Sequence, residues 1–340
     1  MKKAWLSREL SNGKVICLAC AHCCTLVEGE YGKCGVRKVV EGELKLLVYG
    51  LAAAVNVDPV EKKPMFHFLP KSKALSIGTL GCNFSCKFCQ NYEISQYPQT
   101  HEHEIIGHEL SPEAIVEMAI ENRCESIAYT YNEPIVFFEY TYDTAKLAHE
   151  KGIKNIYVTS GYETHKAIDL LTQYIDGMNI DIKSFSDEFY QEICGARLKV
   201  VLGTVQYAHE KGIWIEITTL LIPGKNDSDE EIRSIAKFIA SVDASIPWHI
   251  SAFHPTYKML DVPRTPESTL LRAYKIGQEE GLKYLYVGNV DNKEHESTYC
   301  PNCKKRVIDR SGNIGQFITN ELDDGGVCPH CGYVIDGVFK

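Results

Sequence analysis

Short apolar runs alternate with amphipathic stretches through the middle of the chain, from about residue 74 to residue 290. Many of these runs are rich in β-branched and aromatic residues, a composition that favours strands. The alternation predicts parallel strands joined by helical crossovers. The predicted strands cover residues 74–79, 126–131, 155–159, 178–182, 214–222, 248–253 and 284–287.

Several helix ends can be located from capping residues. Ser111 and Thr265 each precede a proline and are predicted N-caps. Ser228 and Glu231 have the spacing of a capping box. Three other helices are predicted to stop at glycines, which are Gly152, Gly212 and Gly281.

The repeated strand–helix units predict an α/β fold, and a full or partial (β/α) barrel fits them better than a dinucleotide-binding sheet. A Gly-x-Gly-x-x-Gly motif would follow the first strand of a dinucleotide-binding fold, and this chain has none there. In a barrel, the chemistry lies at the C-terminal ends of the strands. We expect a barrel over residues 71–292, with cysteine-rich metal-binding extensions over 1–70 and 293–340.

Composition narrows the class of protein. The 340 residues are 44% hydrophobic and 24% charged, as in ordinary globular proteins. A formal net charge of −9 argues against a nucleic-acid binder, whose affinity comes from cations on phosphates. The sequence shows neither an apolar run of roughly 18 residues nor a signal-peptide core. We therefore expect a cytoplasmic protein without a membrane or nucleic-acid partner.

Fourteen cysteines are the strongest compositional signal. In a reducing compartment such cysteines are more often metal ligands than disulfides. Cys124 and Cys194 stand alone and are expected to be buried apolar residues. The other twelve fall into three short segments, which are 17–34, 82–89 and 300–331.

The central segment follows the first predicted strand. Cys82, Cys86 and Cys89 have the spacing C-x3-C-x2-C. Three thiolates do not close a four-coordinate zinc site, but they can hold a 4Fe–4S cluster and leave one iron without a protein ligand. Such an open iron is a reaction site. A zinc knuckle completed by a distant ligand is the alternative.

This segment resembles the signature of the radical S-adenosylmethionine (SAM) superfamily, in which an aromatic residue precedes the third cysteine, as Phe88 does here. The resemblance implies that the open iron chelates the amino and carboxylate groups of SAM. It also implies reductive cleavage of SAM to methionine and a 5′-deoxyadenosyl radical, which abstracts hydrogen from a substrate. Flavodoxin or ferredoxin is then the expected electron donor.

The resemblance further implies SAM contacts after the second and third strands. Glu133 occupies the acidic position of a Gly-Gly-Glu segment, although Tyr131 and Asn132 replace its glycines. Ser160 lies in a segment similar to the Asp-Thr-Asn-Gly of glycyl-radical-enzyme activases, with Val158 in place of the aspartate. We predict that Glu133 and Ser160 bind SAM. A helix cap is the structural alternative for Glu133.

Two later strands supply the remaining predicted SAM contacts. Asp181 and Lys183 alternate along the fourth strand and are expected to share one face. They match an Asp-x-Lys of the activases, and His254 matches an activase histidine near the ribose. An internal ion pair is the alternative for Asp181 with Lys183, and a packed core histidine is the alternative for His254.

Each terminal group offers four thiolates. Cys300, Cys303, Cys328 and Cys331 form two C-P-x-C knuckles, which predict a closed tetrahedral site that staples the fold. Zinc is favoured there, and iron is possible with the same ligands.

The N-terminal set implied by the resemblance is Cys17, Cys20, Cys24 and Cys34, and Cys23 beside Cys24 makes the third ligand ambiguous. Zinc is favoured over a second iron–sulfur cluster, because nothing in the spacing selects iron.

Residues 58–68, 95–96 and 128–134, together with the terminal cysteines, resemble the radical enzyme of the AmmeMemoRadiSam system, a homologue of pyruvate formate-lyase activating enzyme. This resemblance implies Memo-type and AMMECR-type proteins as partners. We favour radical transformation of a small molecule or of a partner's residue. Activation of a glycyl-radical enzyme is the alternative. A zinc-ribbon scaffold or nucleic-acid-binding protein is a third reading, which the negative charge opposes.

Overall fold

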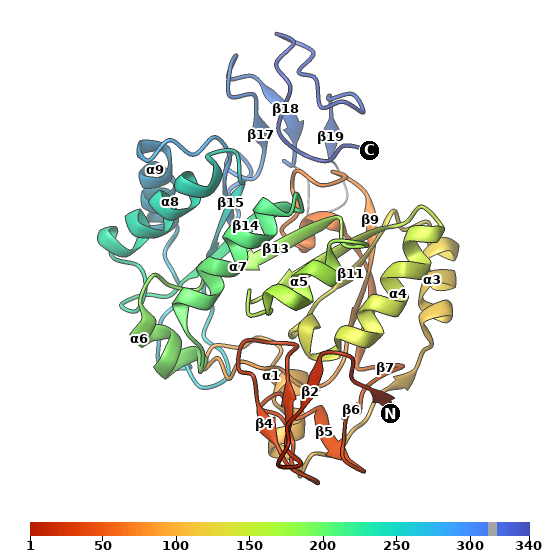
Figure 1. Cartoon of the computed structure of the whole chain (residues 1–340). Coiled ribbons are helices and arrows are strands. Elements are labelled where there is room, and N and C mark those ends of the chain that lie inside the picture. The colour runs from red at the N-terminus through yellow and green to blue at the C-terminus, as the bar shows by residue number, and fades with distance from the viewer. Residues whose placement is uncertain (312–317) are drawn as a thin grey trace.

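A computed structural model describes residues 1–311 and 318–340, and its centre is a mostly parallel sheet (Figure 1). The strand order in this sheet is β16-β15-β14-β13-β12-β11-β9-β8. The parallel strands follow chain order, so each pairs with its sequence neighbour. They are β9 (Lys73–Gly78), β11 (Ser126–Tyr129), β12 (Lys154–Thr159), β13 (Gly177–Asp181), β14 (Trp214–Leu221), β15 (Trp248–Ala252) and β16 (Leu285–Gly288).

The seven predicted strands are all present, and none of their ends differs from the expected one by more than two residues. In the described part of the chain no ladder joins the two outer strands, so the barrel is partial. Strand β8 (Ala54–Pro59) was not predicted. It pairs antiparallel with β9, and its mixed, half-exposed residues give no clear hydrophobic alternation.

Helices connect the parallel strands and lie outside the sheet in Figure 1. Strands that are covered on both faces consist largely of apolar residues. This explains why the strands could be predicted from short apolar runs in the sequence. The longer helices are α3 (Pro112–Glu121), α4 (Phe138–Glu150), α5 (His165–Leu171), α7 (Leu198–Glu210), α8 (Asp229–Asp243) and α9 (Glu267–Glu279). Short helical turns are η1 (Val60–Lys62), α1 (Tyr92–Ser95), α2 (Tyr97–Thr100), η2 (Pro134–Phe137), α6 (Asp187–Phe189) and η3 (Tyr190–Cys194).

Two details of the predicted helix ends were wrong. Ser228 caps α8 as expected, but the Glu231 carboxylate accepts hydrogen bonds from Ser184 and Phe185 instead of closing a capping box. Helix α9 begins after Thr265, whose hydroxyl donates to the Leu221 carbonyl, 2.6 Å away. In both cases a neighbouring strand end offered a buried hydrogen-bond partner that the local pattern does not reveal.

Residues 60–69 cross the lumen of the partial barrel. The Glu216 carboxylate on β14 accepts hydrogen bonds from the backbone amides of Phe66 and His67, at 2.9 and 2.8 Å. Gly177 on β13 leaves room for the crossing, since a Cβ there would lie 2.8 Å from Met65 and 3.0 Å from Phe68. The crossing segment therefore fills the space beneath the strand ends where the site is expected.

Small antiparallel sheets flank the barrel, and in Figure 1 the N-terminal and C-terminal ones lie at opposite ends. The C-terminal sheet contains β17 (Thr298–Tyr299), β18 (Arg306–Asp309) and β19 (Thr319–Asn320). The N-terminal strands are β1 (Lys2–Lys3), β2 (Ser7–Glu9), β3 (Val15–Cys17), β4 (Thr25–Leu26), β5 (Arg37–Val40), β6 (Glu43–Leu46) and β7 (Leu51–Ala52). Strand β7 pairs with β10 (His108–Glu109).

None of the helices described is both long and apolar enough for a membrane span.

Candidate active site

A cavity of about 330 Å³ lies at the C-terminal ends of the parallel strands. Its walls come from the loops after β9, β11, β12 and β13 and from the ends of β14, β15 and β16. The structure therefore brings together side chains that are far apart in sequence, as a barrel mouth does. The predicted residues in its walls are Cys82, Cys86, Cys89, Ser160, Asp181 and Lys183.

The cysteine loop is held in place by its neighbours. Gly81 has a φ of +86°, and a Cβ there would lie 2.6 Å from the Cys34 carbonyl, so only glycine fits. The Asn132 amide donates to the Thr79 carbonyl at 2.8 Å and also to the carbonyl of Gly81. The Ser85 amide donates to the Cys194 carbonyl at 2.9 Å. These contacts fix the loop before any metal binds.

The three thiols fit a cluster better than a single ion. They line one side of the cavity, and among the described residues their sulfur atoms do not all lie within 4.8 Å of one another. Burial raises the pKa of Cys82 and of Cys89. The Cys194 thiol, which lies beside Cys86, lowers the pKa of Cys86. A 4Fe–4S cluster bound here would keep one iron facing the cavity.

Asp181 and Lys183 form an ion pair in the cavity wall, with Lys183 Nζ 2.6 Å from Asp181 Oδ2. The alternation along β13 places both on the lumen side, as expected. Burial opposes the charge on Lys183, but Asp181 and Cys86 raise the pKa of the lysine well above its ordinary value. The pair can therefore offer a permanent cation and a carboxylate to a zwitterionic ligand.

Glu133 is fully buried behind the cavity wall. Its Oε2 accepts a hydrogen bond from the Ser160 amide at 2.8 Å, and its Oε1 accepts one from the Thr159 hydroxyl at 2.9 Å. Oε1 also caps η2 through the Ile135 amide at 3.3 Å. Glu133 therefore positions the Ser160 loop, while its contact with SAM stays a prediction.

His254 lies in the loop after β15 and is half-buried. It is outside the residues that line the cavity, and its proposed contact with a ribose stays a prediction.

Sequence reasoning missed several polar residues in the same cavity. The Asn132 Oδ1 atom is buried and has no hydrogen-bond partner among the described residues. Tyr131 adopts a φ of +73°, the left-handed region that the glycine of a Gly-Gly-Glu segment would favour. For Tyr131, Ser251 and Asn289 the available signal was position, because these residues lie near the end of a strand or shortly after it. The missed residues include Asn91, Gln96, Tyr131, Asn132, Thr218, Ser251 and Asn289.

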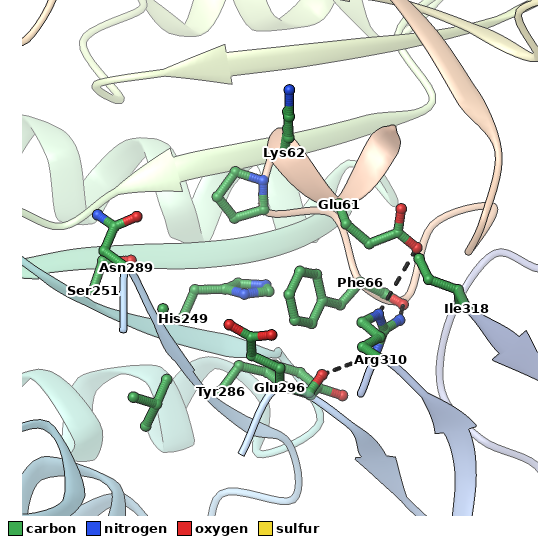
Figure 2. A pocket seen from close by; sticks show the side chains of 13 residues that line it. Glu61, Lys62, Phe66, His249, Ser251, Tyr286, Asn289, Glu296, Arg310 and Ile318 are labelled. Carbon is green, nitrogen blue, oxygen red and sulfur yellow. Dashed lines mark hydrogen bonds and ion pairs between the residues drawn. The ribbon is translucent and has the colours of Figure 1, made fainter. Parts of the chain in front are cut away.

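A second cavity, of about 190 Å³, adjoins the first (Figure 2). Phe66, His249 and Tyr286 form aromatic walls, with ring centroids 4.7 Å apart for Phe66 and His249. Four residues line both cavities, so the two spaces share walls and follow one another through the lumen. The shared residues are Lys62, Pro64, Ser251 and Asn289.

Charged groups gather at the far wall of this second cavity. Figure 2 shows the Glu296 carboxylate below the rings of His249 and Phe66. Glu61 and Arg310 are buried, and the Arg310 Nε atom lies 3.8 Å from Glu61 Oε1, too far for a hydrogen bond. Burial raises the pKa of Glu296 to about 7. Its carboxylate makes no hydrogen bond or ion pair with residues 1–311 or 318–340.

The terminal cysteines form two further groups. Cys300 and Cys331 have sulfur atoms 3.7 Å apart, and those of Cys303 and Cys328 are 3.8 Å apart. All four lie within 4.8 Å of one another, which suits one tetrahedral metal ion.

In the N-terminal group, four cysteines line one cavity, whereas the neighbouring Cys23 is exposed and lies outside it. The four are Cys17, Cys20, Cys24 and Cys34.

Comparisons with known proteins agree with this geometry. The family model of the radical SAM superfamily matches residues 76–239. An uncharacterised protein of Methanocaldococcus jannaschii is 42% identical over 340 residues, which cover all of both chains. The pyruvate formate-lyase 1-activating enzyme of Escherichia coli K12 is 22% identical over 221 residues, 61% of this chain and 89% of that protein.

A solved structure shows the same fold. SuiB of Streptococcus suis bound to S-adenosylmethionine has a TM-score of 0.50 and 16% identity, and the match covers 68% of this chain and 53% of SuiB. The family implies a 4Fe–4S cluster and SAM as cofactors, and the three thiols in the cavity suit the cluster. The chain therefore belongs to the radical SAM superfamily and is an enzyme of the radical SAM type.

Proposed function

We propose that this enzyme cleaves SAM reductively in the first cavity and acts on a small molecule in the second. The observation that carries this proposal is the shared wall between the cysteine-lined cavity and the aromatic one. When bound, the cluster and SAM supply the one-electron chemistry that removes a hydrogen atom from a substrate. A substrate in the second cavity would lie next to the site of that chemistry.

The residues of the first cavity have separate tasks in this proposal. Cys82, Cys86 and Cys89 hold the cluster and leave its fourth iron open. Asp181 and Lys183 face the charged end of SAM, and Ser160 is held in the wall by Glu133. Phe84 and Phe88 form a buried apolar part of the wall, which would shield a reactive species from water on that side.

The second cavity indicates the chemical class of the substrate. Glu296 and the Glu61 Oε2 atom are carboxylate groups without a hydrogen-bond partner among the described residues, so they can accept hydrogen bonds from a ligand. Phe66 and Tyr286 offer apolar faces on the other side. A compact molecule with a protonated amine and an apolar portion fits these walls.

Activation of a partner protein is the second candidate function. It is favoured by the relationship to the pyruvate formate-lyase activating enzyme of Escherichia coli, which matches 61% of this chain.

In either case a low-potential donor such as flavodoxin or ferredoxin supplies the electron. Memo-type and AMMECR-type proteins remain the proposed partners. For the C-terminal cysteines we propose structural zinc.

The first experiment tests reductive cleavage of SAM. Cys86→Ala should abolish both the absorbance near about 400 nm and the formation of 5′-deoxyadenosine, because two thiolates do not hold the cluster. Cys124→Ala is the matched control, since Cys124 is buried outside the cavity and should leave both signals unchanged. Cleavage activity retained by Cys86→Ala would contradict the proposal.

The second experiment separates the two kinds of substrate. Cells grown in deuterated medium provide a low-molecular-mass extract and a protein fraction, each added to the reconstituted enzyme. We expect deuterium in 5′-deoxyadenosine from the small-molecule extract, and we expect Glu296→Gln to lose this transfer while still cleaving SAM. Deuterium transfer from the protein fraction alone would favour the activase function.

A further inference from the structure

We propose that the Cys194 thiol donates a hydrogen bond to the Cys86 thiolate when the central cluster is bound, and that this bond makes the cluster easier to reduce. The sequence alone predicts only a buried apolar cysteine at position 194. The inference rests on the proposed cluster ligands Cys82, Cys86 and Cys89, and it stands whether or not the proposed substrate is correct.

The element that carries Cys194 is packed directly on the cysteine loop. Cys194 ends η3, a single π-helical turn that is followed by Gly195. Such turns are rare and occur frequently at functional sites. Gly195 has a φ of +73°, and a Cβ there would lie 2.5 Å from Ser85 Oγ. Glycine at this position therefore lets the end of η3 approach the cysteine loop closely.

Two backbone hydrogen bonds fix the end of η3 against this loop. The Ser85 amide donates to the Cys194 carbonyl at 2.9 Å, and the Lys87 amide donates to the Ile193 carbonyl at 3.0 Å. Ser85 and Lys87 are the chain neighbours of Cys86. The backbone therefore holds Cys86 and Cys194 next to each other before any cluster binds.

The two thiols meet behind the wall of the first cavity. Cys194 is fully buried, and it is not among the residues that line this cavity, whereas Cys86 is. Cys194 therefore approaches the Cys86 sulfur from the protein interior and leaves the open iron accessible from the cavity.

The pKa shifts of the two thiols agree on which of them donates. A hydrogen bond from Cys194 lowers the pKa of Cys86. Burial, followed by the same bond, raises the pKa of Cys194 well above its ordinary value. Cys194 thus keeps its proton and Cys86 accepts, which is the role that a metal-bound thiolate can take.

A donor on a ligand sulfur changes the redox balance of a cluster. Reduction adds one negative charge to the cluster and its thiolates, and a hydrogen bond stabilises the more negative state more strongly. The reduction potentials of iron–sulfur clusters accordingly depend on hydrogen bonds to their sulfur atoms. The bond from Cys194 therefore raises the potential and favours electron transfer from the low-potential donor. Because Cys194 lies behind the cavity wall, it acts through Cys86.

The test is a redox titration of the full-length enzyme, reconstituted anaerobically and followed by the electron paramagnetic resonance signal of the reduced cluster. Cys194→Ala and Cys194→Val both remove the donor, and valine also fills the space, so that no water replaces the thiol. We expect each variant to lower the equilibrium constant for one-electron reduction by a factor of about three to ten, which is about 30 to 60 mV. The iron and sulfide content per chain should equal that of the wild type.

Two further variants separate the hydrogen bond from other effects. Cys194→Ser is the rescue variant, because its hydroxyl restores a donor and should return the potential towards the wild-type value. Cys124→Ala is the matched control, since Cys124 is also buried but lies outside the cavity, and it should leave the potential unchanged.

The outcomes are distinguishable. A wild-type potential in both Cys194→Ala and Cys194→Val would overturn the proposal, and so would an equal decrease in Cys194→Ser. Loss of iron and sulfide in Cys194→Ala would make Cys194 a ligand and would also overturn it. Failure of the wild-type enzyme to cleave SAM, with the shift in potential present, would refute the proposed function and leave the role of Cys194 standing.

Discussion

A pair of buried carboxyl groups lies behind the wall of the first cavity, the proposed SAM site. Thr159 Oγ1 lies 2.9 Å from Glu133 Oε1 and 2.5 Å from Glu163 Oε1. One hydroxyl has a single proton and donates to only one of them, so a proton on the other carboxyl completes the network. Burial, followed by the charge of Glu133, raises the pKa of Glu163 to about 8. Below that pH, Glu163 therefore carries the shared proton.

This pair makes stability depend on pH. The pKa of Glu163 is higher in the folded state than in the unfolded state, so the folded protein binds the extra proton between about pH 4.5 and about pH 8. Wild-type stability therefore falls as the pH rises through this window, by at most about 1.4 kcal/mol per pH unit. Glu163→Gln should remove this decline. The Tm of the variant should therefore rise relative to the Tm of the wild type as the pH increases.

Thermal unfolding of the reconstituted protein between about pH 6 and about pH 8.5 checks this expectation. Glu150→Gln, at an exposed position on α4, is the control and should show the wild-type slope. If Tm changes with pH in the same way for Glu163→Gln and the wild type, the shared proton does not belong to Glu163.

At the scale of elements, the N-terminal sheets are attached to the barrel by a buried ion pair. Arg37 on β5 donates to both oxygens of Glu139 on α4, at 2.5 and 3.2 Å, and its Nε donates to the Val136 carbonyl. Both side chains are almost completely buried. Glu139 also accepts the Trp5 amide at 3.0 Å. This contact sets the N-terminal cysteines beside the loop that carries Cys82.

Glu139→Ala should destabilise the protein by about 3–5 kcal/mol, because it leaves the Arg37 charge buried without a partner. Chemical unfolding measures the loss, and limited proteolysis should show earlier cutting within the N-terminal sheets. Lys211→Ala removes an exposed ion pair with Asp169 and should have little effect on the free energy of unfolding, because water screens such pairs. A loss for Glu139→Ala as small as the loss for Lys211→Ala would show that the pair does not hold these elements together.

At the scale of the whole molecule, the C-terminal sheet closes the second cavity. Arg310 donates to the Phe66 carbonyl at 2.6 Å, and the Leu69 amide donates to the Val338 carbonyl at 2.7 Å. His67 Nε2 lies 2.5 Å from the Tyr286 hydroxyl, and its Nδ1 lies 2.6 Å from the Asp336 carbonyl. The C-terminal sheet, with its proposed metal site, therefore supports a wall of the proposed substrate pocket.

Loss of the proposed metal should abolish hydrogen transfer from the substrate but leave SAM cleavage in place. Cys328→Ser should release the ion and loosen the Arg310 wall, so deuterium transfer from the substrate should be lost. SAM cleavage without substrate should persist within about a factor of two, because the first cavity does not contain these residues. Metal analysis and product quantification provide the measurements.

His330→Ala is the matched control, since His330 lies between the knuckle cysteines but pairs with Glu321. It should retain the metal and the deuterium transfer. Loss of SAM cleavage in Cys328→Ser would mean that the C-terminal sheet supports the whole barrel and not only the second cavity.

The local features of this protein were predictable from its sequence. The seven parallel strands, the cysteine loop after β9 and the two C-terminal knuckles all depend on residues a few positions apart. Their spacing is set by the backbone itself, so a linear pattern is sufficient to find them.

Tertiary structure alone decided the features that depend on distant segments. The second cavity combines Glu61, His249 and Arg310, the Glu133–Glu163 pair meets at one hydroxyl, and Arg37 finds its partner on α4. Such contacts arise from long-range packing, in which sequence distance carries no information about distance in space.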